Sequence, residues 1–225
     1  MTKTFEIEGL PVSWVRDGPL RDRPVLVLAH GAGASYHSVF MQETAAGLVK
    51  RGIAVVRFHF PYMERAHTSG TRRPPGPKRR LLATYREMVK RAAKLRGRGP
   101  LFIGGKSMGG RMASMILADD APPISVVGAV YLGYPLHPSG RPEKLRSEHL
   151  PQVAVPQLFV SGTRDALATP QLLKPIVKRL PKAELLEVEG ADHSLARSRK
   201  HPMRDADAWL DAVSGFVHRV APVAQ

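Results

Sequence analysis

The sequence predicts an α/β fold: a mostly parallel, twisted sheet of about seven or eight strands with helices on both faces. Short apolar runs alternate with amphipathic helical patterns along nearly the whole chain, which is the order that builds a parallel sheet. Several of these runs are continuously apolar, as expected of strands buried on both faces. Because the 225 residues contain no internal repeat and no long linker, we expect a single domain, residues 1–225.

The first half of the chain opens with a predicted hairpin. Segments 4–9 and 12–16 alternate apolar and polar residues around a Leu-Pro pair, which is typical of two half-buried strands. The run "PVLVLAH" at 24–30 predicts a fully buried strand, and a helix follows over about 38–51, where Gly52 ends it. The next apolar run, "IAVVRFHF" at 53–60, predicts another strand.

The second half continues the alternation. Apolar runs predict four more strands, at 100–105, 125–134, 155–162 and 183–190. Helical periodicity predicts helices at 81–95, 107–118, 169–180 and 206–220. In the last of these, five large apolar side chains share one face: Trp209, Leu210, Val213, Phe216 and Val217. Ligands of such sheets bind at the carboxyl ends of the strands, so the segments after each strand are the ones to search for chemistry.

Composition excludes several classes of site. The chain has no cysteine, which excludes disulfides, cysteine metal sites and a cysteine nucleophile. No apolar run approaches the roughly 18 residues that cross a bilayer. The N-terminal segment "MTKTFEIEGLP" lacks the pattern of a secretory signal. We therefore expect a cytoplasmic protein, a monomer or homodimer, with no membrane partner and no metal or other cofactor.

The charge is strongly positive, at +15. The basic residues concentrate in "TRRPPGPKRR" at 71–80, which holds no acidic residue, and in the helix that follows. The two interpretations are a solvated loop and helix face, or a patch that attracts anions such as nucleic acid or another polyanion. The charge alone names no partner.

The stretch "FIGGKSMGGRMAS" at 102–114 carries the most specific motif. Gly105, Ser107 and Gly109 fit the pattern G-x-S-x-G, directly after a predicted strand and at the start of a predicted helix. This context predicts a nucleophile elbow, a sharp turn that holds a serine in an unfavourable backbone conformation and needs small neighbours. The helix N-terminus adds a positive dipole end beside a developing anion.

A nucleophilic serine needs a base and an acid that orients the base. Among nine histidines, His193 in "EVEGADHSLA" follows the last predicted strand. Asp165 in "GTRDALATP" also follows a strand, which gives the chain order Ser107, Asp165, His193 that α/β-hydrolases use. Asp192 is the competing acid, but side chains of neighbouring residues rarely point at each other.

The tetrahedral intermediate of acyl transfer needs two N–H donors. One usually comes from the residue after the nucleophile, here Met108. The other should come from the loop "AHGAGAS" after strand 24–30, where we expect Ala32, with Gly33 as the alternative.

Together, "LVLAHGAGAS", "FIGGKSMGGRMAS", "GTRDALATP" and "GADHSL" resemble the α/β-hydrolase superfamily over about residues 24–218. The segments "VVRFHFPYME" and 131–165 resemble the dienelactone-hydrolase-related branch. That branch includes bacterial hydrolases without an assigned substrate, a testis-expressed animal protein and a subunit of a chromatin acetyltransferase complex. The resemblance implies an α/β-hydrolase fold with Ser107, Asp165 and His193 as a catalytic triad. Dienelactone hydrolases proper use a cysteine nucleophile, so Ser107 argues against that activity.

Two loops are expected to shape the pocket. Residues 58–67 offer His59 and Tyr62, and residues 131–138 offer Tyr134 and His137. From the glycine-rich loop we expect His30, Gly31 and Gly33 to contact the substrate as well. Only 21 residues separate Tyr134 from Val155, too few for a large helical lid, so an open site with a minimal lid is expected.

These observations predict a serine hydrolase that cleaves a small-molecule carboxylic ester or thioester through an acyl-enzyme. Two alternatives stay open. A peptidase would use the same three residues, because fold and triad do not separate esters from amides. A non-catalytic interaction module would use the basic face to bind an acidic partner.

Overall fold

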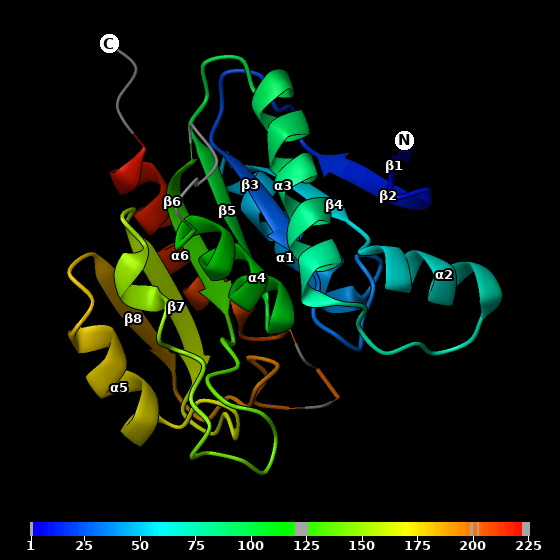
Figure 1. Cartoon of the computed structure of the whole chain (residues 1–225). Coiled ribbons are helices and arrows are strands. Elements are labelled where there is room, and N and C mark those ends of the chain that lie inside the picture. Colours follow the sequence, from blue (N-terminus) through cyan, green and yellow to red (C-terminus); the bar gives the residue numbers. More distant parts are fainter. Residues whose placement is uncertain (1, 120–125, 199, 202, 222–225) are drawn as a thin grey trace.

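The computed structural model describes residues 2–119, 126–198, 200–201 and 203–221. It confirms the predicted fold class: an eight-stranded, mostly parallel sheet with helices on both faces (Figure 1). Across the sheet the strands follow the order β1-β2-β4-β3-β5-β6-β7-β8. Their bounds are Lys3–Ile7 (β1), Leu10–Asp17 (β2), Val25–Ala29 (β3), Ala54–Phe58 (β4), Leu101–Lys106 (β5), Val126–Leu132 (β6), Gln157–Gly162 (β7) and Ala183–Val188 (β8).

The pairing brings the strand ends together at one edge. β1 and β2 form the predicted hairpin, and β2 joins β4 antiparallel, whereas β4, β3, β5, β6, β7 and β8 run parallel. In this register Ala29 of β3 lies level with Phe58 of β4 and with Gly105 of β5. The loops that follow these three strands therefore share one edge of the sheet, where a ligand site is expected.

Two apolar cores, one on each face of the sheet, hold the helices. Helices α3, α4 and α5 bury Tyr85, Met112 and Leu173 against one face, and α1 and α6 bury Leu48 and Trp209 against the other. The helix bounds are Val39–Lys50 (α1), Pro61–Ser69 (α2), Lys78–Leu95 (α3), Met108–Leu117 (α4), Pro170–Lys178 (α5) and Ala206–Val220 (α6). None of the helices in the described residues has the length and apolar character that crossing a membrane requires.

The prediction missed one helix. Residues 58–67 were expected to form a loop, but α2 begins at Pro61 and projects beside the sheet (Figure 1). Its signals are a proline at the first helical position and Gly70, which ends the helix with a φ of 67°. The minimal lid is confirmed: residues 134–155 contain one short 3₁₀ turn, Leu150–Gln152, and no longer helix. Residue 125, where the sixth strand was expected to begin, lies outside the described residues.

Candidate active site

Ser107 lies on a strained turn between β5 and α4. Its φ of 52° falls in the region that residues with a side chain rarely adopt. The turn is crowded: a Cβ on Gly105 would lie 2.5 Å from the carbonyl oxygen of Ala29, and one on Gly109 would meet the same oxygen. Only glycine fits at these two positions, so the sequence forces Ser107 to the carboxyl edge of the sheet at the N-terminus of α4.

The side chains of Ser107, His193 and Asp165 lie in hydrogen-bonding contact. Nε2 of His193 lies 2.9 Å from Oγ of Ser107, and Nδ1 lies 3.0 and 2.9 Å from the two carboxylate oxygens of Asp165. Asp165 is fully buried, whereas the His193 side chain is 27% exposed. A buried carboxylate on Nδ1 favours the tautomer with its proton there, which leaves Nε2 free to accept the serine proton.

The competing acid faces elsewhere. Oδ1 of Asp192 accepts the N–H groups of Ser194 and Ala196, at 2.8 and 3.3 Å, and so holds its own turn. Asp165 in contrast keeps its carboxylate on the imidazole and accepts one further N–H, from Leu167 at 2.8 Å. The structure therefore brings Asp165, and not Asp192, to His193.

Lys106, the residue before the serine, supports the histidine loop. Its Nζ donates to the carbonyl oxygen of His193 at 2.6 Å. Burial lowers the pKa of Lys106 to about 8, although the carboxylates of Asp165 and Asp192 act in the opposite direction. The lysine thus ties the turn that carries Ser107 to the loop that carries His193, a role for which the sequence offered no signal beyond its place in the motif.

Ala32 and Met108 line the same cavity as Ser107. The N–H of Met108 belongs to the first turn of α4, where no intrahelical acceptor exists. The carbonyl oxygen of Gly31 faces the interior, because Nδ1 of His30 lies 2.7 Å from it. Since a trans peptide directs its N–H opposite to its carbonyl, the N–H of Ala32 points away from His30. Two such donors can stabilise an oxyanion.

His30 and Tyr62 hold the glycine-rich loop and do not line the cavity beside Ser107. The N–H of Phe60 donates to Nε2 of His30 at 3.1 Å, so His30 carries its proton on Nδ1 and donates to Gly31. Burial lowers the pKa of His30 to about 3, which keeps the ring neutral. The hydroxyl of Tyr62 donates to the carbonyl of Ala32 at 3.0 Å. The expected substrate contacts of His30 and Tyr62 are therefore corrected to contacts with this backbone.

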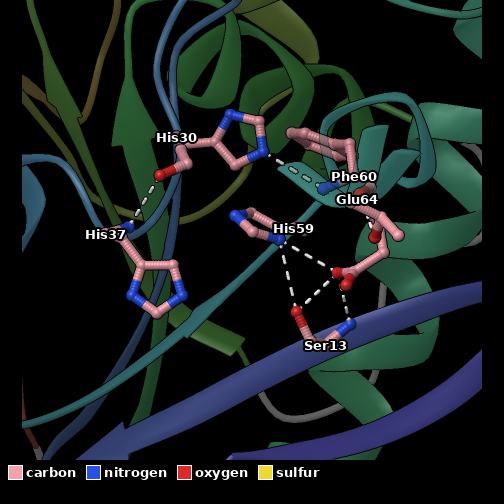
Figure 2. Close-up of polar contacts among 8 residues, drawn as sticks. Ser13, His30, His37, His59, Phe60 and Glu64 are labelled. Atoms are coloured by element: carbon pink, nitrogen blue, oxygen red, sulfur yellow. Dashed lines mark hydrogen bonds and ion pairs between the residues drawn. The ribbon is translucent and has the colours of Figure 1, made fainter. Parts of the chain in front are cut away.

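His59 and Tyr134 are also corrected to the interior. His59 is fully buried and shares Glu64 with Ser13: its Nδ1 lies 2.9 Å from the carboxylate and 3.2 Å from Oγ of Ser13 (Figure 2). Tyr134 is 1% exposed, and its hydroxyl donates to the carbonyl of Arg146 at 3.1 Å. α2 supplies Glu64, so the helix missed by the prediction is what encloses His59.

The two glycines of the loop differ in place. Gly31 is buried, and a Cβ on it would lie 3.5 Å from Cβ of Ser107, which puts its backbone against the Ser107 side chain. Gly33 is exposed and lines a second cavity, of about 260 Å³, beside His67 and Arg72. Ala32 lies between them and borders both cavities.

The cavity beside Ser107 has a volume of about 460 Å³. Its walls come from α4, from the start of α3 with the basic segment before it, and from the loop after β6. His137, offered by the sequence, lies in this wall, but Arg111 and Arg146 were missed. Helical spacing was a signal for Arg111, which follows Ser107 by four residues and so shares its face of α4.

Comparisons with known proteins agree with this architecture. Residues 22–221 match the model of a family described as "Alpha/beta hydrolase domain". Est1E from Butyrivibrio proteoclasticus, solved with ferulic acid bound, is 15% identical with a TM-score of 0.74, covering 97% of this chain and 98% of that one. An alpha-beta serine hydrolase homologue from Coxiella burnetii is 14% identical, with a TM-score of 0.71 and coverage of 97% and 96%. Dienelactone hydrolase from Anabaena variabilis is 19% identical, with a TM-score of 0.69 and coverage of 98% and 95%.

Proposed function

The chain belongs to the alpha/beta hydrolase domain family, and from that premise we propose that it is a serine hydrolase acting on a carboxylic ester or thioester. The observation that carries the proposal is the imidazole of His193, hydrogen-bonded to Ser107 on one nitrogen and to a buried carboxylate on the other. The fold alone does not require this arrangement, because the same fold hosts many functions.

In the proposed reaction, Oγ of Ser107 attacks the acyl carbon while Nε2 of His193 takes its proton. The charge of Asp165 stabilises the imidazolium that forms. The oxyanion accepts hydrogen bonds from the N–H groups of Ala32 and Met108. When the intermediate collapses, Nε2 of His193 returns the proton to the leaving oxygen or sulfur. Water then cleaves the acyl-enzyme by the same steps.

Features of the cavity support a small-molecule ester or thioester substrate over a non-catalytic interaction module. The site is open and lacks a large lid, and the similar structure Est1E holds a carboxylic acid, ferulic acid. Three residues of the basic segment 71–80 line the cavity: Pro75, Gly76 and Lys78. That placement favours a role for this segment at the site itself over a separate docking face for an acidic protein.

The test is covalent labelling with a fluorophosphonate, followed by peptide mapping, together with a panel of short-chain esters and thioesters. We expect the label on Ser107, no label in Ser107→Ala, and a loss of turnover of about 10³-fold or more in that variant. Ser13→Ala is the matched control, because Ser13 also contacts a histidine and a carboxylate, and it should be labelled like the wild type. Undiminished ester turnover in Ser107→Ala would overturn the proposal.

A further inference from the structure

The cavity beside Ser107 gathers positive charge. Three cations line it: Arg111 from the first turn of α4, Lys78 from the start of α3 and Arg146 from the loop before the 3₁₀ turn. No acidic side chain lines it among the described residues. Three like charges around one small volume repel each other, so the arrangement calls for a negative partner.

The protein does not supply that partner. Elsewhere, the buried guanidinium of Arg57 is held by both carboxylate oxygens of Asp17, at 2.7 and 2.8 Å. In the described part of the chain, by contrast, no ion pair includes Arg111, Arg146 or Lys78. Lys78 is exposed and Arg111 and Arg146 are half-buried, so their charges are accessible to an anion in the cavity.

Two residues that line this cavity, Arg111 and His137, each have one buried nitrogen without a hydrogen-bond partner. Nε of Arg111 is buried and has no hydrogen-bond partner. Nε2 of His137 is also buried without a partner, in a side chain that is 3% exposed and lies in the cavity wall. Nδ1 of His137 lies 2.8 Å from the carbonyl oxygen of Pro138, so Nε2 is the nitrogen of this ring that has no partner.

The positive charge of Arg111 acts on both Arg146 and His149, and at His149 the charge of Glu148 opposes it with a smaller effect. Burial lowers the pKa of Arg146, and the positive charge of Arg111 lowers it further. Burial likewise lowers the pKa of His149 to about 4, again with Arg111 as the second cause. An anion bound between these groups would relieve the repulsion.

The position of His193 indicates which part of a substrate the cavity takes. In the proposed reaction Nε2 of His193 delivers a proton to the leaving group, so the leaving group must lie beside His193. The cavity is lined by Ser107, Ala32 and Met108 but not by His193. It therefore lies on the acyl side of the bond that is cleaved.

We propose that this cavity binds an anionic acyl group, so that the substrate is an ester or thioester whose acyl part ends in a carboxylate or a phosphate-like group. Arg111 and Arg146 bind the anion, with Lys78 and His137 completing the subsite. A guanidinium binds a planar carboxylate or a phosphoryl group through two parallel hydrogen bonds, which gives orientation as well as attraction. This inference rests on the proposed hydrolase function.

The experiment compares two substrates that differ only at the far end of the acyl chain: mono-para-nitrophenyl glutarate and its methyl ester, each corrected for spontaneous hydrolysis. We expect the wild type to prefer the free acid by about tenfold or more in kcat/KM. Arg111→Met and Arg146→Gln should each lower this preference by about tenfold while the methyl ester is still cleaved. Comparing kcat/KM for the para-nitrophenyl ester of phosphonopropionic acid with that for the glutarate shows whether the cavity prefers a phosphate-like group or a carboxylate.

Arg98→Gln is the matched control, because it removes one positive charge from an exposed side chain at the opposite edge of the sheet. It should leave the preference unchanged. Equal turnover of free acid and methyl ester by the wild type, or an unchanged preference in both cavity variants, would overturn the anionic subsite while the hydrolase function stands. Failure to cleave either ester, with no fluorophosphonate label on Ser107, would instead overturn the function itself.

Discussion

The molecule contains two clusters of a serine, a histidine and a carboxylate, and they differ in how the ring is used. In the first, Ser107 and Asp165 contact opposite nitrogens of His193. In the second, Ser13 and Glu64 both contact Nδ1 of His59, and Nε2 is buried without a partner (Figure 2). Only the first arrangement leaves Nε2 on the serine, where it can take and return a proton, while a carboxylate on Nδ1 can stabilise the imidazolium.

Exposure separates the clusters as well. The His193 side chain is 27% exposed beside an open cavity, whereas His59 is fully enclosed between β2, β4 and α2. The comparison teaches that residue types alone do not make a triad. Ring orientation and access to a cavity decide between a reactive cluster and one that joins two elements of the fold.

The largest expected difference between the clusters is in activity. Asp165→Asn should lower kcat by about 10³-fold, because an amide cannot stabilise the imidazolium and favours the wrong tautomer of His193. Glu64→Gln should leave kcat/KM within about threefold of the wild type, since its cluster lies apart from the cavity. Steady-state ester hydrolysis measures both. A loss of similar size in Glu64→Gln would mean that the two clusters are coupled.

The second expected difference is in stability, and here the cluster of Ser13, His59 and Glu64 is the one expected to matter. Burial alone would raise the pKa of Glu64, but hydrogen bonds from His59 and Ser13 lower it from 4.5 to about 2. A carboxyl group whose pKa is lower in the folded state stabilises the fold above its unfolded pKa. That contribution is lost as the pH falls from about 4.5 toward 2.

Glu64→Gln should therefore lower the free energy of unfolding by about 2 kcal/mol at pH 7. The difference in free energy of unfolding between the variant and the wild type should narrow between pH 5 and pH 2. This range is set by the pKa of Glu64 in the unfolded chain, 4.5, and in the fold, about 2. Urea unfolding across this range measures it. Glu43→Gln, at an exposed site, is the control and should change stability by less than about 0.5 kcal/mol. A gap that stays constant with pH would contradict the assignment of the effect to the Glu64 carboxylate.

The smallest expected effect is on the free energy of unfolding when either serine is replaced. Ser107 holds a φ of 52°, so Ser107→Gly should raise the free energy of unfolding by about 1 kcal/mol by relieving backbone strain. Ser13→Ala should lower it by about 1 kcal/mol, because Glu64 loses a hydrogen-bond donor. Thermal unfolding of both variants tests the opposite signs. Destabilisation by Ser107→Gly would show that the turn is not strained.

Except for α2, the sequence predicted the order of strands and helices, because each of these elements carries its own periodicity. It also predicted the surroundings of Ser107, since the crowding at Gly105 and Gly109 is local and leaves a mark in residue types. Asp165 and His193 were predicted as partners of Ser107 because each follows a strand. That rule places a residue at the right edge of the sheet.

The same rule does not say which way a side chain points from that edge. His59 and Tyr134 also follow strands, yet both turn inward, because α2 and the loop after β6 cover them. α2 itself was missed since few of its side chains are apolar; only Pro61 and Tyr62 are buried. Arg146 entered the cavity from a loop without periodicity, and nothing local in its sequence indicates that placement.

The contact between Lys106 and the carbonyl of His193 has a practical consequence for protein engineering. In G-x-S-x-G the residue before the serine is written as a free choice, but here it props up the loop of the histidine. A new scaffold that received this turn without its lysine would hold the serine but would not fix the position of the His193 loop. Residues 105–109 should therefore be transferred together with the loop that Lys106 supports.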